Sequence, residues 1–78
     1  MSISGELSEV VSIDAQVVSG APVFRGTRVP VRALLDHVEA GDSLEAFLDG
    51  FPSVSREQAT RFIELAGEAA IETVARPA

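Results

Sequence analysis

Arginine side chains gather around one short turn in the first half of the chain. Arg25, Arg28 and Arg32 lie in residues 15–35, which contain no acidic residue. Guanidinium groups bind phosphate and carboxylate oxygens, often through two parallel hydrogen bonds. The turn therefore predicts an anion-binding surface, either for nucleic-acid phosphates or for the carboxylates of a partner. An internal role is equally open, because nine acids follow in residues 36–72 and could pair with these arginines in the same chain or in a second copy.

A second group of polar residues lies at the predicted start of the last helix, where Ser55, Arg56 and Gln58 are suited to phosphates or base edges. A tri-helical core that never contacts nucleic acid remains the alternative. We expect Arg61 to pair with Glu57 or Glu64 on its own helix. The full set predicted to contact nucleic acid is Arg25, Thr27, Arg28, Arg32, Ser55, Arg56 and Gln58.

The last helix also carries acids along one face. Such a face would repel a phosphate backbone unless it is turned away from it, so we predict that it meets a protein partner. The residues concerned are Glu57, Glu64, Glu68 and Glu72.

Catalytic chemistry is not expected. The chain has no cysteine, no lysine and one histidine, His37, so neither a Cys/His metal cage nor a disulfide can form. Asp36 and His37 are neighbours and would point about 100° apart on a helix, which prevents a nucleophile relay. Gly20 and Gly26 have five residues between them, where a phosphate loop has four, and no lysine follows the second glycine. We expect no enzyme, no cofactor and no metal.

Composition limits the class of protein further. The chain has 78 residues, enough for one small domain, and alanine makes up a large part of its 46% hydrophobic residues. Oligomerisation is an economical way to bury more surface. The net charge of −6 disfavours unspecific attraction to DNA. No apolar run is long enough for a membrane span, and the N-terminus has acids where a signal peptide has bases. We therefore expect a cytoplasmic protein.

The pattern of residues predicts a short β segment followed by three helices. β-Branched residues between glycines and prolines favour short strands over residues 10–29, the last ending near Val29. Apolar residues then recur with helical spacing over about 31–40, 43–50 and 55–74. Residues 1–9 and 75–78 are expected to be a flexible N-terminus and a tail.

Local signals define the ends of these helices. Gly41 is expected to stop the first, Asp42 or Ser43 to cap the second, and Ser55 with Gln58 to form a capping box for the third. Gly26 is the position most suited to a positive φ. The buried stripe of the third helix is predicted to be Ala59, Phe62, Ile63, Ala66 and Ala70, and His37 is expected on a solvated face. Two short helices before a longer one follow the order of a helix-turn-helix with a small wing-like sheet.

One string of residues adds a family resemblance. Residues 20–31 read GAPVFRGTRVPV, followed by Gly41-Asp42-Ser43, by Phe51-Pro52 and by Val54-Ser55. This pattern resembles the domain of unknown function 433 family, whose signature contains Arg-Gly-Thr-Arg and a Phe/Tyr-Pro pair before the last helix. The resemblance covers about residues 10–70. The chain departs from the family at Ser19-Gly20-Ala21, where Gly-Gly-Lys/His is common, and at Leu65-Ala66, where Tyr-Ala is frequent.

The resemblance implies a winged-helix-like or homeodomain-like helix-turn-helix domain, mainly α with a short N-terminal β segment and dimeric. It also implies an antitoxin that binds a PIN-like ribonuclease toxin and represses their shared promoter. A ribonuclease must attract RNA, so its basic surface would suit the acidic face of the last helix or, alternatively, the acidic second helix. The alternative is a dimeric protein-interaction module that does not bind DNA.

Overall fold

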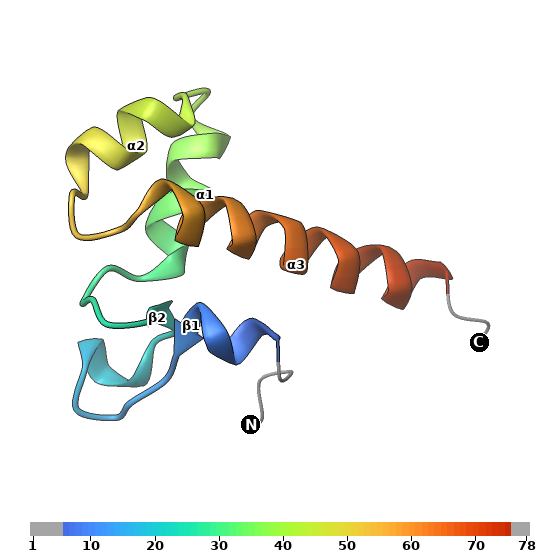
Figure 1. Ribbon diagram of the computed structural model, residues 1–78, viewed down its shortest axis with the longest axis horizontal. Coiled ribbons are helices and arrows are strands. Elements are labelled where there is room, and N and C mark those ends of the chain that lie inside the picture. Colours follow the sequence, from blue (N-terminus) through green and yellow to red (C-terminus); the bar gives the residue numbers. More distant parts are fainter. Residues whose placement is uncertain (1–5, 76–78) are drawn as a thin grey trace.

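The computed structural model describes residues 6–75, which fold into three helices and a two-stranded β segment near the N-terminus (Figure 1). The predicted fold class, mainly α with a short N-terminal β segment, is confirmed. In chain order the elements are η1 (Leu7–Glu9), β1 (Val11–Ser12), η2 (Val18–Gly20), β2 (Val23–Phe24), α1 (Val31–Glu39), α2 (Leu44–Gly50) and α3 (Arg56–Ala75).

The β segment is shorter than its sequence suggests. The antiparallel strands β1 and β2 pair Val11 with Phe24 and Ser12 with Val23. Val29 lies outside the strands, although its carbonyl accepts a hydrogen bond from the Phe24 N–H at 2.9 Å. The rest of the segment is occupied by turns because glycines and prolines interrupt every run of β-branched residues.

The turn at η2 is strained. Val18 and Ser19 have φ angles of 48° and 54°, in the left-handed region that L-residues with a Cβ adopt at a cost of roughly 1–2 kcal/mol each. A β-branched residue such as Val18 is rarely found there. The following Gly20 has a φ of 82°, so the left-handed conformation continues through the end of the turn.

The predicted helix ends are correct to within one residue. Ser43 and Ser55 precede α2 and α3 as N-caps. The Oγ atom of each serine accepts a hydrogen bond from the backbone N–H three residues later, at 3.1 Å for Ser43 and 3.0 Å for Ser55. Gly41 follows α1 with a φ of 83°, as a C-terminal stop requires. Backbone geometry and short polar side chains set these ends locally, so the sequence is sufficient to place them.

The main core lies where the three helices meet the β segment. Phe24 and Phe47 are fully buried, and the Phe24 ring contacts the rings of Phe47 and Phe62 at centroid distances of 6.0 and 5.6 Å. Aromatic pairs in tilted or edge-on geometry stabilise a small core beyond their area of burial. The buried residues of this cluster are Phe24, Val29, Leu34, Phe47, Val54 and Ala59.

A second, smaller cluster fixes the N-terminal segment beneath α3. Val10, Val11 and Leu65 are buried together, and Leu7 of η1 packs against them. The structured region therefore begins before the predicted boundary at residue 10, while residues 1–5 of the expected flexible N-terminus, and 76–78 of the tail, lie outside the described residues.

The buried face of α3 differs from the predicted stripe. Leu65 is buried, whereas Ile63 is 46% exposed and Ala70 is exposed. Ala59 is buried and Phe62 and Ala66 are partly buried, as predicted. The prediction was wrong for Ile63 and Ala70 because η1 and β1 pack on the Leu65 side of α3, and helical periodicity alone does not fix which side that is.

His37 also differs from its expected solvated position. Its ring is half-buried and meets the rings of Phe47 and Phe51 edge-on, at centroid distances of 5.5 and 5.7 Å. Its Nδ1 lies 3.1 Å from the Ala33 carbonyl oxygen, one turn earlier in α1. His37 therefore acts as an aromatic contact between α1 and α2.

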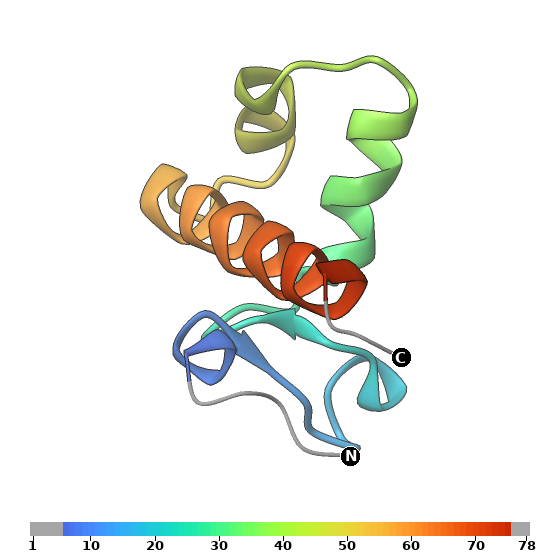
Figure 2. The same ribbon diagram turned by 90° about the vertical axis from the view of Figure 1, so that its right-hand side faces the viewer.

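The longest helix, α3, extends past the rest of the molecule (Figures 1 and 2). The residue-75 end lies far from α2, and Figure 2, which looks along α3, places α1 and the β segment on different sides of it. Despite its length, α3 is too polar to cross a bilayer, and no other helix within residues 6–75 meets the requirement either.

Candidate functional site

The Arg25-Gly26-Thr27-Arg28 turn is held by the hydroxyl of Thr27. That hydroxyl donates to the Phe24 carbonyl oxygen at 2.7 Å and accepts from the Val29 N–H at 3.0 Å. Gly26 has a φ of 80°, as predicted, which allows the chain to reverse direction there. Thr27 therefore has a structural role in the turn, and its hydrogen-bonding groups are already engaged.

Arg25 connects the same turn to the N-terminal segment. Its Nε donates to the Ser8 carbonyl oxygen at 2.6 Å, and one terminal nitrogen donates to the Val11 carbonyl oxygen at 3.3 Å. Hydrogen bonds from a charged group are stronger than neutral ones, so Arg25 stabilises the position of η1. The side chain remains exposed, and its charge still contributes to the local potential.

Arg32 and Arg56 form ion pairs within the chain. Arg32 pairs with Asp36 at 3.0 Å and with Glu39 at 3.1 Å, all on the surface of α1. Arg56 pairs with Glu45 of α2. The Arg56 guanidinium, first by hydrogen bonding, lowers the pKa of the Glu45 carboxyl, and Glu45 in turn raises the pKa of Arg56. Internal pairing, the alternative that the sequence left open for Arg25, Arg28 and Arg32, thus holds for Arg32.

Ser55 and Gln58 stabilise the first turn of α3. Ser55 caps the helix, but the reciprocal half of the expected capping box is replaced by a long-range contact. The Gln58 Nε2 donates to the Arg25 carbonyl oxygen at 2.9 Å and lies 3.4 Å from that of Val10. Gln58 therefore links α3 to both the Arg25 turn and the N-terminal segment.

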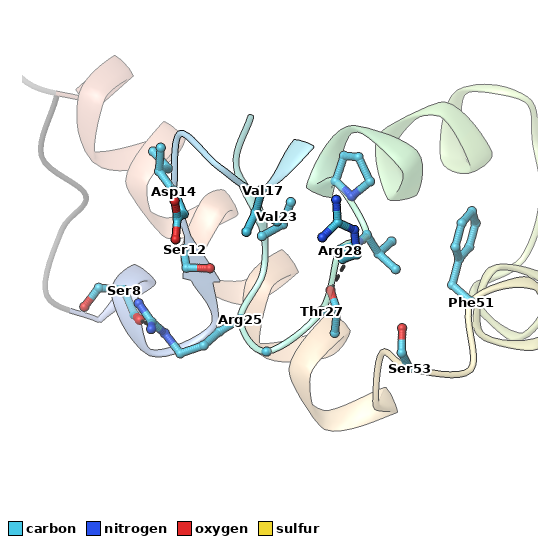
Figure 3. A pocket seen from close by; sticks show the side chains of 14 residues that line it. Ser8, Ser12, Asp14, Val17, Val23, Arg25, Thr27, Arg28, Phe51 and Ser53 are labelled. Carbon is cyan, nitrogen blue, oxygen red and sulfur yellow. Dashed lines mark hydrogen bonds between the residues drawn. The ribbon is translucent and has the colours of Figure 1, made fainter. Parts of the chain in front are cut away.

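Arg28 is the remaining member of the predicted set. Within residues 6–75 it has no hydrogen-bond or ion-pair partner, and its side chain is exposed. It lines an open groove of about 1080 Å³ between the β segment and the loop before α3 (Figure 3). In Figure 3, Arg28 lies on the side of Phe51 and Ser53, and Arg25 lies apart from it, beside Ser8. The groove can offer an anion one uncommitted guanidinium.

The predicted nucleic-acid residues do not form one surface. Arg25, Thr27 and Arg28 line the groove of Figure 3. Ser55, Arg56 and Gln58 line a second, shallower groove of about 750 Å³ at the start of α3. Arg32 lines neither, because it lies on the outer surface of α1 with its acidic partners.

The acidic residues of α3 are exposed, as their spacing predicts. Glu57 and Glu64 line the second groove together with Arg61, and Glu68 and Glu72 continue along the projecting part of the helix. The expected ion pairs of Arg61 with its helix neighbours are absent among the described residues. Residues 62–75 contain three acidic side chains and no basic one, and the nearest arginines in the sequence are Arg61 and Arg76.

Some residues of the grooves carried no recognisable signal in the sequence. Asp14 and Ser53 line the groove of Arg28, and Glu45 pairs with Arg56 from eleven residues away. Isolated polar residues in loops have no periodicity, and contacts at such separations depend on how α2 and α3 pack. Only the folded chain could identify them.

Comparison with known proteins places the chain in a family. A solved structure of a DUF433 member protein from Anabaena variabilis ATCC 29413 superposes with a TM-score of 0.67 at 21% identity, covering 85% of this chain and 65% of that one. The "Uncharacterized protein y4eO" of Sinorhizobium fredii (strain NBRC 101917 / NGR234) is 42% identical over 50 residues, which span 64% of this chain and 23% of the relative. This chain thus matches less than a quarter of the length of y4eO. The family model described as "Protein of unknown function (DUF433)" matches residues 11–66, and the chain belongs to the DUF433 family.

Proposed function

We propose that this protein is an antitoxin, which binds a PIN-like ribonuclease toxin through the acidic face of α3. The observation that carries the proposal is the exposed negative charge of the projecting helix. Glu64, Glu68 and Glu72 follow one another at four-residue spacing, and all three are exposed. A surface that attracts RNA phosphates is basic, and a rigid row of carboxylates complements it.

The mode of inhibition follows from that complementarity. Carboxylates at successive turns of a helix are about 6 Å apart along its axis. They could occupy positions on the toxin that otherwise hold consecutive phosphates, so the bound antitoxin would exclude RNA. The PIN-like identity of the toxin derives from the family resemblance, and the charge argument requires only a basic partner.

Affinity measurements with matched variants test this function. The product of the neighbouring reading frame would be titrated with the wild type and with a triple variant, Glu64→Gln/Glu68→Gln/Glu72→Gln. The control, Glu39→Gln/Asp42→Asn/Asp49→Asn, makes the same change in net charge in α1, in α2 and in the loop between them. We expect at least about a tenfold loss for the α3 variant and a much smaller loss for the control. An equal loss of toxin affinity in both variants, or a wild-type affinity that is the same at low and high salt, would refute the proposal.

Promoter binding is a second candidate function, and one observation supports it. Arg28 has a guanidinium without a partner among the described residues, in a groove that Arg25 also lines. One free arginine gives weak attraction in a chain of net charge −6, so DNA binding would depend on the toxin or on a second copy. A gel shift with upstream DNA, with and without the nuclease, tests it: Arg28→Ala should abolish a shift that Arg32→Ala leaves intact. No shift under either condition would leave the protein-interaction role alone.

A further inference from the structure

The projecting half of α3 exposes more apolar surface than a monomer of this size requires. Every residue from 67 to 74 is exposed. Ile71 and Val74 expose 70% and 86% of their surface, and Ile63, nearer the body, exposes 46%. A helix end without tertiary packing is only marginally stable in water, so a partner that covers these side chains would stabilise it.

Four residues on the exposed side of α3 have the spacing of a coiled-coil seam, and Ile71 lies next to them without following that spacing. Ile63, Gly67, Ala70 and Val74 follow one another at steps of four, three and four. That alternation keeps residues on one line along a helix and is the pattern by which two helices pack side by side. We call these four residues the α3 seam. It is distinct from the buried side at Leu65.

Gly67 has no explanation within its own chain. It lies in the middle of a 20-residue helix, where glycine costs roughly 1 kcal/mol relative to alanine. A Cβ built on it would meet nothing within 4 Å, so no neighbour in residues 6–75 requires a small residue there. Small residues on an exposed helix face allow the backbone of a second helix to come close.

The order of sizes along the α3 seam points to a second copy of the same chain. The seam reads large, small, small, large, which is the same from either end. In an antiparallel pair, Gly67 faces the partner's Ala70, and Ile63 faces the partner's Val74. The helices can then approach at the centre while large side chains fill both ends. An isologous two-fold interface requires this self-complementarity.

We propose that the protein forms a homodimer through antiparallel packing of the two α3 seams. In a parallel pair, side chains of equal size would also face each other. That arrangement is less favourable because the two helix dipoles point in the same direction and repel each other. It also leaves both projecting ends next to each other, away from either domain body. In the antiparallel pair, each projecting half is covered by the half of the partner helix that joins the domain body. Glu68 and Glu72 fall outside the seam at this spacing, so the dimer leaves them accessible. The dimer does not depend on the antitoxin role.

Substitution of Gly67 tests whether the seam self-associates. Gly67→Leu should preserve the fold, because the site is open within the chain, and should weaken the dimer by at least about tenfold because it separates the helices. Gly50→Leu is a matched control: Gly50 also lies in a helix with nothing within 4 Å of a Cβ. Sedimentation equilibrium measures both. A monomeric wild type, or equal dimerisation of all three proteins, would overturn the proposal.

Cysteine cross-linking tests the orientation, since the chain has no cysteine of its own. Ile63 and Val74 are about 16 Å apart along one helix, too far for a disulfide within a chain. Under mild oxidation, a mixture of the Ile63→Cys and Val74→Cys variants should give a cross-linked heterodimer, while each variant alone stays largely uncross-linked. Efficient cross-linking of Val74→Cys alone would show a parallel pair and refute the antiparallel arrangement.

Discussion

The side-chain amide of Gln58 donates a hydrogen bond to the carbonyl oxygen of Arg25, 33 residues earlier in the chain. This contact joins the first turn of α3 to the turn that carries the arginines. It also explains why the Gln58 side chain does not complete the expected capping box in this fold. Most of the polar groups that the sequence singles out for binding also make contacts within the domain.

Removal of the Gln58 amide should therefore reduce stability. We expect Gln58→Ala to lower the free energy of unfolding by about 1–2 kcal/mol, because the Arg25 carbonyl loses the donor of its side-chain hydrogen bond. The Val10 carbonyl loses a longer contact but keeps its hydrogen bond from the Arg25 N–H. Gln58→Glu should be no better, since a carboxylate cannot donate to a carbonyl. Chemical denaturation measures both. Gln16→Ala, at an exposed loop position, is the control and should stay close to wild type; an equal loss there would contradict the specific role of Gln58.

Substitutions of Arg25 and Arg28 should affect the stability of the fold to different extents. Arg25→Ala removes two hydrogen bonds to the N-terminal segment and should lower the free energy of unfolding by about 1 kcal/mol or more. Arg28→Ala should change it by less than about 0.5 kcal/mol, because the side chain is exposed and unpaired among the described residues. Denaturation of the two variants side by side tests the difference, and the reverse order would refute the roles assigned here.

The left-handed conformation of Ser19 lowers the stability of the fold, and a substitution that tolerates this conformation should raise it. Ser19→Gly is expected to raise the free energy of unfolding by about 0.5–1 kcal/mol, because glycine adopts a φ of 54° without the Cβ penalty and the gain exceeds its entropy cost. Ser19→Ala retains the Cβ and should give no gain. Thermal unfolding of the pair distinguishes a relief of strain from the simple loss of the hydroxyl.

The Glu45–Arg56 ion pair should make stability depend on pH in the acidic range. The pKa of Glu45 is lower in the folded chain than its ordinary value, near 4.5. The stabilisation is therefore fully present above that ordinary value and is lost as the pH falls through the lower pKa of the folded state. The thermal midpoint of the wild type should exceed that of Glu45→Gln at pH 7, and the difference should shrink as the pH falls below that ordinary value. Both residues are exposed, so the effect is small and weakened by salt.

Asp49→Asn provides the comparison for that experiment. Asp49 lies in the same helix and forms no ion pair within residues 6–75. Its substitution should leave no comparable difference in thermal midpoint at pH 7. A pH-dependent difference of the same size for both variants would show that net charge, and not the pair with Arg56, is responsible.

The sequence alone determined the elements and their ends. Gly41 stops α1, Ser43 and Ser55 cap the next two helices, and Gly26 takes the positive φ of the turn. Each of these signals acts within about one turn of chain, through backbone geometry and short side chains. They can be read without knowledge of the rest of the molecule.

Tertiary structure decided what the polar and apolar residues do. Arg56 forms an ion pair with Glu45, eleven residues away in the sequence. Arg25 donates a hydrogen bond to the Ser8 carbonyl, seventeen residues away, and Gln58 donates one to the Arg25 carbonyl, thirty-three residues away. Leu65 is buried and Ile63 exposed because the N-terminal segment packs on one side of α3. Periodicity and charge show that a helix has distinct faces, but the face that is covered depends on how distant segments pack together.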